Sequence, residues 1–481
     1  MPAENQPLVV AIIGAGPSGI YAAEALSQQS EVPVQVAVLD RLPVPFGLVR
    51  YGVAPDHHSI RSIRNTLERT LSKAGVRFYG DVTIGRDVTV DELRSTVDAV
   101  IYAFGAGSDR RLGIEGEDLV GSIAAPEFVA WYCGHPDVHP DTDRTARRTA
   151  PDELELEAER AAQLVATTRQ AVVVGVGNVA LDVARVLIKS ADELAETDMA
   201  DDVLASLAGK TVTDVYLLGR RGPAYTSFTT KELREIGQLP GVDVIIDERD
   251  LELDESSQAV VGQDKVAARN VAVMREWATR QPSGASRRIH FRFWTRPIRL
   301  LGEGRVRAVE TERTRLNADG FVDGAGPGET IEAQLVVRSV GYKGIEMPGV
   351  PFDESTGRVP HSEGRVIRDG AFSDDEYVTG WIKRGPTGVI GTNKSDAVET
   401  VTSLLADVHD GDVVPRHRID ELDALLASRG IHPLGMPAWR RIDAAEIELG
   451  HSHGRERTTL AHRAELLAAA DEPDDEAGRE S

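Results

Sequence analysis

Two stretches of the chain repeat one pattern of apolar and polar positions. In each, a short apolar run meets a glycine-rich turn and then a segment of helical composition. In the first stretch, residues 8–13 read LVVAII, the turn is GAGPSG at 14–19, and IYAAEALSQQ follows. The next apolar run, at 34–39, ends in Asp40. This order predicts strand, tight turn, helix and strand, as in a unit that binds a dinucleotide.

The second stretch begins at residue 171 with AVVV, turns through GVGNVA at 175–180, and continues with the helical LDVARVLIKS. Its next apolar run, at 215–218, leads into Gly219, Arg220 and Arg221 rather than into an acid. Parallel strands require crossover connections, so each stretch is expected to build its own parallel sheet. The pattern therefore predicts an α/β fold with two Rossmann-like units.

Other segments also carry a regular pattern. Residues 284–300 alternate as a strand does, with basic side chains on one face and apolar side chains on the other. Residues 59–71 and 395–408 have helical spacing, and the second helix is expected to lie in the first unit. Residues 135–165 are polar and rich in proline, which is typical of a linker or a surface excursion, and the acidic tail at 471–481 is predicted to be disordered.

The first turn has the chemistry of a pyrophosphate site. Gly14 and Gly16 allow a tight turn and a close approach of the pyrophosphate to the helix start at Pro17 and Ser18. Asp40 is expected to accept hydrogen bonds from a ribose diol. A carboxylate repels a 2′-phosphate, so this site favours FAD or NAD over NADP.

The second site has the opposite charge. Arg220 and Arg221 stand where an acid would be expected, and guanidinium groups bind phosphate with paired hydrogen bonds. Ala180 replaces the third glycine of the turn. The site is predicted to prefer NADP(H) to NAD(H); the alternative is that two surface arginines merely follow a strand.

Composition narrows the class of protein. The 481 residues suffice for two or three domains at roughly 150 residues each. Cys133 is the only cysteine, which excludes disulfide reductases with a cysteine pair and four-cysteine metal or iron–sulfur sites, so no metal is predicted. The net charge of −23 argues against nucleic acid as a partner, and much of the acid lies in 191–202, 241–255 and 471–481.

The N-terminal residues, MPAENQP, lack the features of a secretory signal or a transit peptide, which predicts a cytoplasmic protein. No run of about 18 apolar residues occurs, so no membrane insertion is expected. An FAD-like and an NADP-like site without an internal acceptor indicate a flavoprotein that passes electrons to a partner outside the chain.

Longer motifs resemble those of the adrenodoxin-reductase-like ferredoxin–NADP+ reductases, particularly the actinobacterial enzymes. They are PFGLVRYGVAPDH (45–57), VGNVALDVAR (176–185), GRRGP (219–223), FTTKELRE (228–235), VVRSVGY (336–342) and GWIKRGPTGVIGTNKSDA (380–397). The likeness extends from about residue 8 to about residue 405. It implies a glutathione-reductase-like architecture, with an FAD domain formed by 1–108 plus 332–470 and an NADP domain inserted at 109–331.

The resemblance also implies roles for particular residues. FAD contacts are implied for the turn at Gly14, Gly16, Pro17 and Ser18, and for Asp40, Leu48, Val82, Trp381, Gly388, Val389 and Ile390. NADP contacts are implied for Arg110, Val176, Gly177, Asn178, Val179, Arg220, Arg221, Glu232 and Gly388. His57 and Glu235 match the active-site pair near the nicotinamide, and Phe46 stands where many members have tryptophan.

Hydride transfer needs no general base, so His57 is expected to modulate turnover; the alternative is that His57 and His58 cap a helix. Ferredoxins are typically acidic, so the arginines of 59–71, with Arg61 and Arg64 on one helix face, and the arginine run at 287–299 are candidates for docking. The alternative is that these arginines balance nearby acids.

The predicted function is that of an FAD-dependent ferredoxin–NADP+ reductase, in which flavin converts the hydride of NADPH into single electrons for a ferredoxin. Two rival functions stay open at this point. One is an NADPH-dependent flavin monooxygenase, and the other is a non-catalytic NADP(H)-binding redox sensor.

Overall fold

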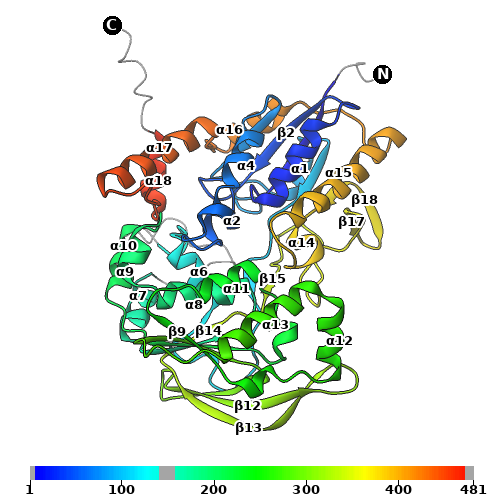
Figure 1. The fold of residues 1–481 in the computed structure, drawn as a ribbon. Coiled ribbons are helices and arrows are strands. Elements are labelled where there is room, and N and C mark those ends of the chain that lie inside the picture. The colour runs from blue at the N-terminus through cyan, green and yellow to red at the C-terminus, as the bar shows by residue number, and fades with distance from the viewer. Residues whose placement is uncertain (1–5, 140–157, 472–481) are drawn as a thin grey trace. The chain divides into compact units, whose positions relative to one another are not determined.

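The computed structural model describes residues 6–139 and 158–471, which fold as two compact units (Figure 1). The first unit contains residues 6–108 and 342–471, and the second contains residues 109–139 and 158–341. The chain crosses between them after Ser108 and after Gly341, and the crossing segments β5 (Ser108–Asp109) and β15 (Tyr342–Lys343) pair as a two-stranded sheet. The acidic tail expected to be disordered lies, from residue 472, outside the described residues.

The first unit is built on a seven-stranded sheet in the order β16-β17-β18-β4-β1-β2-β3. Strands β18, β4, β1, β2 and β3 run parallel, and β17 and β16 add an antiparallel edge. All six residues of β1 are buried, as expected of a central parallel strand. The strands are β1 (Leu8–Ile13), β2 (Val34–Leu39), β3 (Val76–Tyr79), β4 (Ala99–Tyr102), β16 (His361–Ser362), β17 (Arg365–Arg368) and β18 (Ala371–Val378).

Helices from both ends of the chain cover this sheet. The long helices α1 and α15 lie side by side (Figure 1), although they come from opposite ends of the sequence. The helices are α1 (Pro17–Gln28), α2 (Leu48–Tyr51), α3 (His58–Arg61), α4 (Arg64–Leu71), α5 (Val90–Arg94), α14 (Trp381–Arg384), α15 (Thr392–Asp410), α16 (Ile419–Ser428), α17 (Met436–Ser452) and α18 (Arg463–Asp471).

The second unit is built on a six-stranded sheet in the order β6-β14-β7-β8-β10-β9, in which every pairing is parallel. These strands are β6 (Ser122–Ala124), β7 (Gln170–Val174), β8 (Asp214–Leu218), β9 (Val242–Ile246), β10 (Arg287–Arg292) and β14 (Leu335–Arg338). Strand β14 pairs with β7, so this unit continues to Gly341, past the expected boundary at 331.

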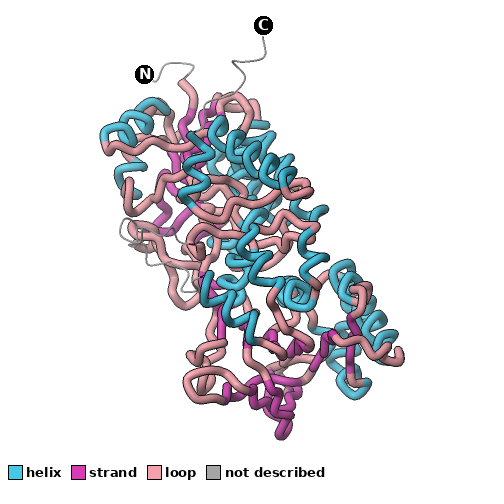
Figure 2. Tube along the Cα trace, turned by 90° about the vertical axis from the view of Figure 1, so that its left-hand side faces the viewer, coloured by secondary structure: helices cyan, strands magenta, loops and turns pink. Residues whose placement is uncertain are grey.

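An antiparallel sheet of β11 (Thr295–Leu301), β12 (Ala308–Leu316) and β13 (Val322–Glu332) covers one face of the parallel sheet, and Figure 1 shows helices on the other. Figure 2 marks the strands in magenta and the helices in cyan. The helices are α6 (Ala125–Tyr132), α7 (Ala158–Thr167), α8 (Asn178–Ile188), α9 (Ala191–Ala195), α10 (Asp201–Ala208), α11 (Thr230–Ile236), α12 (Glu255–Gln263) and α13 (Lys265–Ala278), with 3₁₀ turns at Pro223–Tyr225 and Glu248–Leu251.

The fold class predicted from the sequence, α/β with two Rossmann-like units, is confirmed. Two predicted elements differ in detail. The expected strand at 284–300 is two strands, β10 and β11, because the backbone turns at Trp294, whose φ is 51°. The expected helix at 59–71 is likewise divided into α3 and α4. Within the described residues, no helix combines the length and the apolar composition needed to cross a membrane.

Candidate functional site

The turn after β1 leaves open space at the start of α1. Gly14 has a φ of 112°, and a Cβ placed on it would lie 2.5 Å from the carbonyl oxygen of Ala103. At Gly16, the N-cap of α1, a Cβ would meet no atom within 4 Å, and no side chain caps the helix. The first N–H groups of a helix have no partner within the helix, so this open turn fits a pyrophosphate.

Asp40 holds the turn to the loop that follows β2. Its carboxylate accepts hydrogen bonds from the N–H of Ala15 at 2.8 Å and of Leu42 at 2.9 Å. Burial raises the pKa of Asp40, although these two N–H groups oppose the rise. Each carboxylate oxygen has a second lone pair, so a ribose hydroxyl can still donate to this group.

The loop at 46–48 lies directly against the glycine turn. The N–H of Phe46 donates to the carbonyl of Ala15 at 2.8 Å, and a Cβ on Gly47 would lie 3.0 Å from the Cα of Gly16. Leu48 follows with an exposed fraction of 37%. Buried Val82 donates its N–H to the carbonyl of Asp40 at 2.9 Å. Asp40 is therefore linked to the glycine turn through its carboxylate, Val82 is linked to Asp40 through the backbone, and Leu48 follows a loop that is bonded to the same turn.

The later motif, at 380–397, reaches the same turn from the C-terminal half of the chain. Ser18 Oγ donates to Asn393 Oδ1 at 2.8 Å, which joins the starts of α1 and α15. Trp381 begins α14, and its ring centroid lies 5.3 Å from that of Tyr342. Asp396 accepts the N–H of Gly380 and pairs with Lys383 at 3.0 Å.

The predicted flavin contacts Gly388, Val389 and Ile390 precede Gly391, the N-cap of α15. Helix α15 begins at Thr392, slightly before the expected start. Val389 is 57% exposed, and its N–H donates to Thr392 Oγ1 at 3.2 Å. In this structure a threonine hydroxyl therefore accepts the N–H of Val389, one of the residues for which the resemblance implies a flavin contact.

His57 lies in the first unit and Glu235 in the second, so the predicted pairing of their side chains stays a prediction. His57 is 4% exposed and occupies the N-cap of α3, but its imidazole makes no capping hydrogen bond. This counts against the capping alternative for His57. Glu235 lies on α11, with its carboxylate 4.0 Å from Lys231 Nζ.

The second glycine turn connects β7 with α8. Gly177 is the N-cap of α8, and no side chain caps that helix. Asn178 Oδ1 accepts the N–H of Thr229 at 3.0 Å, and Thr229 caps α11 by accepting the N–H of Glu232. The predicted NADP contacts Asn178 and Glu232 are thus joined through Thr229. Val176, also predicted to contact NADP, accepts the N–H of Ser227 at 2.9 Å, and Val179 is partly exposed within α8.

Arg220 and Arg221 follow β8, and both are exposed. Within the described residues, neither guanidinium forms an ion pair with an acid; Arg221 lies 5.6 Å from the ring centroid of Tyr225. Arg110, at the beginning of the second unit, is also exposed. The two arginines after β8 therefore remain available for a phosphate, and the open helix start fits a bound dinucleotide.

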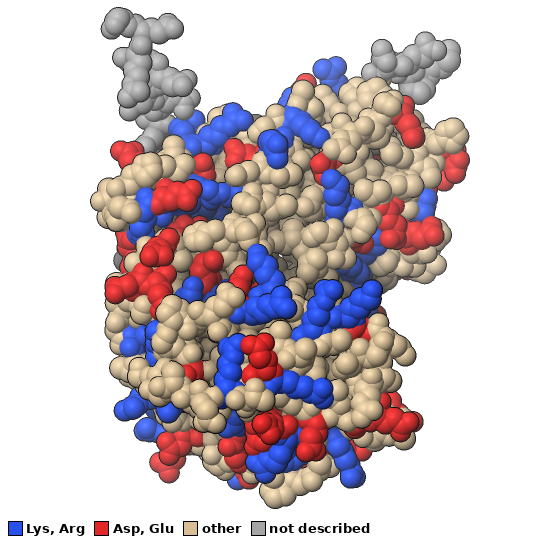
Figure 3. Space-filling model, viewed as in Figure 1, with Lys and Arg blue, Asp and Glu red and all other residues tan. Residues whose placement is uncertain are grey.

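The arginine run at 287–299 is, by contrast, fully paired with acids. The pairs are Arg287–Glu193 at 3.2 Å, Arg288–Asp214 at 2.6 Å, Arg292–Glu329 at 2.6 Å, Arg296–Glu312 at 2.6 Å and Arg299–Glu310 at 2.8 Å. Figure 3 shows acidic and basic side chains interspersed on the drawn face of this unit. The run therefore balances local acids, which was the alternative to docking.

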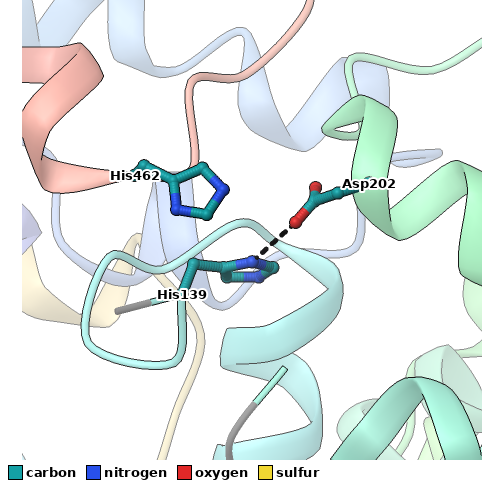
Figure 4. Close-up of side chains that lie close together, drawn as sticks. All are labelled: His139, Asp202 and His462. Carbon is teal, nitrogen blue, oxygen red and sulfur yellow. Dashed lines mark hydrogen bonds and ion pairs between the residues drawn. The ribbon is translucent and has the colours of Figure 1, made fainter. Parts of the chain in front are cut away.

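His139 uses both ring nitrogens within the second unit. Its Nδ1 lies 2.9 Å from Asp202 on α10 (Figure 4), and its Nε2 lies 3.0 Å from the carbonyl of Trp131 on α6. These hydrogen bonds connect the end of α6 with α10, so this histidine has a structural role there.

Sequence reasoning missed Thr229, Asn393 and Asp396, which hold the predicted contacts in place. Thr229 and Glu232 have the spacing of a helix cap, T-x-x-E, and that signal was available in the sequence. Asn393 and Asp396 carry no such local signal, because their partners, Ser18 and Gly380, are distant or belong to another helix.

Comparison with known proteins gives consistent matches. Residues 8–274 match the family model described as pyridine nucleotide-disulphide oxidoreductase. The NADPH-ferredoxin reductase FprA of Mycobacterium tuberculosis is 43% identical over 477 residues, which covers 96% of this chain and 99% of the relative. The mitochondrial NADPH:adrenodoxin oxidoreductase of Arabidopsis thaliana is 36% identical and covers 97% of this chain and 96% of its own.

A solved structure of M. tuberculosis FprA in complex with NADPH superposes with a TM-score of 0.86, covering 97% of this chain and 100% of that one. The family is named for disulphide reduction, but this chain has one cysteine and cannot form the redox-active cysteine pair that such a reaction uses. The chain belongs to the pyridine nucleotide-disulphide oxidoreductase family and, within it, to the NADPH-ferredoxin reductases.

Proposed function

We propose that this chain is an FAD-dependent ferredoxin–NADP+ reductase that moves electrons between NADPH and an iron–sulfur protein. The observation that carries this proposal is the contrast between two open glycine turns. One is followed by the carboxylate of Asp40, and the other by Arg220 and Arg221, which have no acidic partner among the described residues. Bound FAD accepts electrons as a hydride and releases them singly.

In this proposal the first unit binds FAD. The N–H groups at the start of α1 bind the pyrophosphate, and Asp40 accepts a ribose hydroxyl. Leu48, Val82, Trp381 and residues 388–390 complete the site. His57 is proposed to act near the nicotinamide, together with Glu235, as a modulator of turnover.

The second unit binds NADP(H) in this proposal. The start of α8, with Val176, Gly177, Asn178 and Val179, receives the pyrophosphate, while Arg220 and Arg221 bind the 2′-phosphate. Arg110, Glu232 and Gly388 are proposed as further contacts. The preference for NADPH over NADH then rests on the two arginines.

Steady-state kinetics of the double variant Arg220→Ala/Arg221→Ala test this assignment. We expect the KM for NADPH to rise about a hundredfold and the KM for NADH to change little, since two charge-assisted contacts to the 2′-phosphate are lost. Arg249→Ala is the matched control, because Arg249 is an exposed arginine of the same unit that pairs with Asp247. Equal changes for both nucleotides would contradict the assignment.

The proposed partner is an iron–sulfur protein with an acidic docking face. Of the arginines first considered on 59–71, Arg61 is buried and donates to the carbonyl of Arg50 at 3.1 Å, so it is not a docking residue. Arg69 and Arg440 are exposed and hydrogen bond only to neutral groups within the described residues. Arg440 donates to Ser72 at the end of α4, which joins these two cations on one face of the first unit.

The proposed location is the cytoplasm. A single cysteine precludes an intramolecular disulfide, as is usual for proteins of reducing compartments.

A further inference from the structure

Helix α17 belongs to the C-terminal part of the chain, to which the sequence assigned no chemistry. One of its side chains, Glu446, is completely buried and forms an ion pair with Arg50 on α2, which is 5% exposed. Arg50 belongs to the motif at 45–57, next to the glycine turn of the proposed flavin site.

All the acceptor positions of the Glu446 carboxylate are used. Arg50 donates to both oxygens, one of these bonds being 3.0 Å long, and Arg457 Nε donates to Oε2 at 3.2 Å. The N–H of Leu460 donates to Oε1 at 3.0 Å. Burial alone would raise the pKa of Glu446, but Arg50 and Arg457 outweigh this effect and lower it. The Glu446 carboxylate is therefore charged, and both of its oxygens accept two hydrogen bonds.

Aromatic rings hold the same arginine. The Arg50 guanidinium lies 5.1 Å from the ring centroid of Tyr51 and 5.9 Å from that of Trp439, which is also on α17. Trp439 in turn packs edge-on against Phe46, with 5.2 Å between ring centroids. Helix α17 thus fixes α2 through an ion pair at one position and through ring contacts at another.

These contacts extend to the proposed site. Phe46 has a φ of 87°, a conformation that is costly for a residue with a side chain and requires support from its surroundings. Its N–H donates to Ala15 in the glycine turn. The carbonyl of Arg50 accepts from Arg61, and the N–H of Arg61 donates to the carbonyl of His57 at 3.0 Å. Glu446 is therefore connected, through Arg50 and Trp439, to the loop at 46–48 and to the turn at His57.

We propose that Glu446 is a positioning residue for the flavin site, which holds Arg50, and through it the loop at 46–48 and the turn at His57, in the binding conformation. This inference rests on the proposed function of the first unit as an FAD domain. Glu446 itself contacts neither the glycine turn nor Asp40, so its effect passes through Arg50.

The variant Glu446→Gln keeps the volume of the side chain and removes its charge. After removal of FAD and reconstitution, we expect the Kd for FAD to rise at least about tenfold, because Arg50 loses its fixed orientation. The visible circular dichroism of the bound flavin is expected to change as well, since the loop beside it moves. A purely structural role would lower the Tm without changing either of these two readouts.

Asp443→Asn is the matched control on the same helix. Asp443 pairs with Arg457 and, within the described residues, does not pair with Arg50, so its loss weakens the contact between α17 and Arg457 and leaves the Arg50–Glu446 pair in place. We expect this variant to have a lower Tm and a Kd for FAD within about twofold of the wild type. If both variants lose stability and both retain the wild-type Kd and dichroism, the positioning role is refuted.

Arg50→Lys provides a second test in case Glu446→Gln does not fold. Lysine keeps the buried positive charge beside Glu446 but cannot form two parallel hydrogen bonds. We expect a folded protein whose Kd for FAD is raised several-fold, and a wild-type Kd would overturn the inference. FAD binding by the wild-type protein is measured before either variant. A wild-type protein that binds no FAD would overturn the proposed function itself.

Discussion

Gly380 shows how closely two distant motifs meet. Its φ is 79°, and a Cβ placed on it would lie 2.2 Å from Ser18 Oγ, in the first turn of α1. Ser18 donates to Asn393 at the start of α15, so the glycine allows these two helix starts to approach each other. The sequence predicted contacts with the cofactor from both motifs, but not that the motifs touch each other.

Gly380→Ala and Gly370→Ala form a pair that separates crowding from backbone strain. Gly370 has a similar φ of 83°, but a Cβ there would meet nothing within 4 Å. We expect Gly370→Ala to cost about 1 kcal/mol of unfolding free energy, from the left-handed backbone alone. Gly380→Ala should cost about 1–3 kcal/mol more, because Ser18 must move.

Urea denaturation and FAD titration of both variants measure these effects. The Kd for FAD should rise only in Gly380→Ala, since only this change displaces Ser18 beside the glycine turn. Identical behaviour of the two alanine variants would show that the contact with Ser18 has no energetic importance.

The strands of the second unit show which features sequence patterns could predict. The apolar runs at 171–174 and 215–218 became β7 and β8 because buried parallel strands are continuously apolar. The alternation at 284–300 correctly placed Ile289 and Phe291 on a buried face. The acids that pair with the arginines of 284–300 could not be predicted, because they lie on other strands and not beside the arginines in the sequence. Asp214 lies on β8, Glu312 on β12 and Glu329 on β13.

Asp214 illustrates such a cross-strand pairing. It accepts hydrogen bonds from Arg288 at 2.6 Å and from His290 at 2.8 Å, both on β10. The His290 ring stacks on Tyr216 with 4.3 Å between centroids. Burial opposes ionisation, but Arg288, His290 and Thr213 lower the pKa of Asp214 to about 2. The carboxylate therefore stays charged between β8 and β10.

This pKa gives a pH dependence of stability. The folded value of about 2 lies below the ordinary 3.8, so the stabilisation is complete above about pH 4 and is lost as the pH falls toward 2. We expect Asp214→Asn to be about 2 kcal/mol less stable than the wild type at pH 7. The difference should decrease by about half at pH 3.

Urea denaturation at pH 7, 5, 4 and 3 measures this difference. Asp319→Asn, in the exposed turn between β12 and β13, serves as the control and should show little difference at any of these pH values. A deficit of Asp214→Asn that stays constant down to pH 3 would mean that the loss comes from packing and not from the charge.

The charge of the whole chain, −23, has to be reconciled with an acidic partner. The arginine run at 287–299 does not resolve this, because each of its members pairs with an acid of its own unit. The cations whose charge is least compensated are those that form no ion pair with an acid within the described residues. On the first unit these include Arg69 and Arg440, and Lys73, which donates to Ser27, lies in the same region after α4.

Reversal of these charges tests the docking surface directly. In Arg69→Glu/Arg440→Glu we expect kcat/KM for an acidic ferredoxin to fall about tenfold or more at low ionic strength, and its dependence on salt to weaken, because attraction between opposite charges is screened by salt. Reduction of ferricyanide by NADPH needs no protein docking, so its rate should stay at the wild-type value.

The control for that experiment is Arg280→Glu on the second unit, an exposed arginine that follows α13 and pairs with Glu276. It changes the net charge in the same direction, so it shows how much of the effect comes from total charge. Arg280→Glu reverses one charge, and the double variant reverses two. If net charge alone governs docking, Arg280→Glu will therefore lower the logarithm of kcat/KM by half as much as the double variant does. If the face formed by Arg69 and Arg440 governs docking, Arg280→Glu will leave kcat/KM nearly unchanged, because Arg280 does not belong to that face and pairs with Glu276.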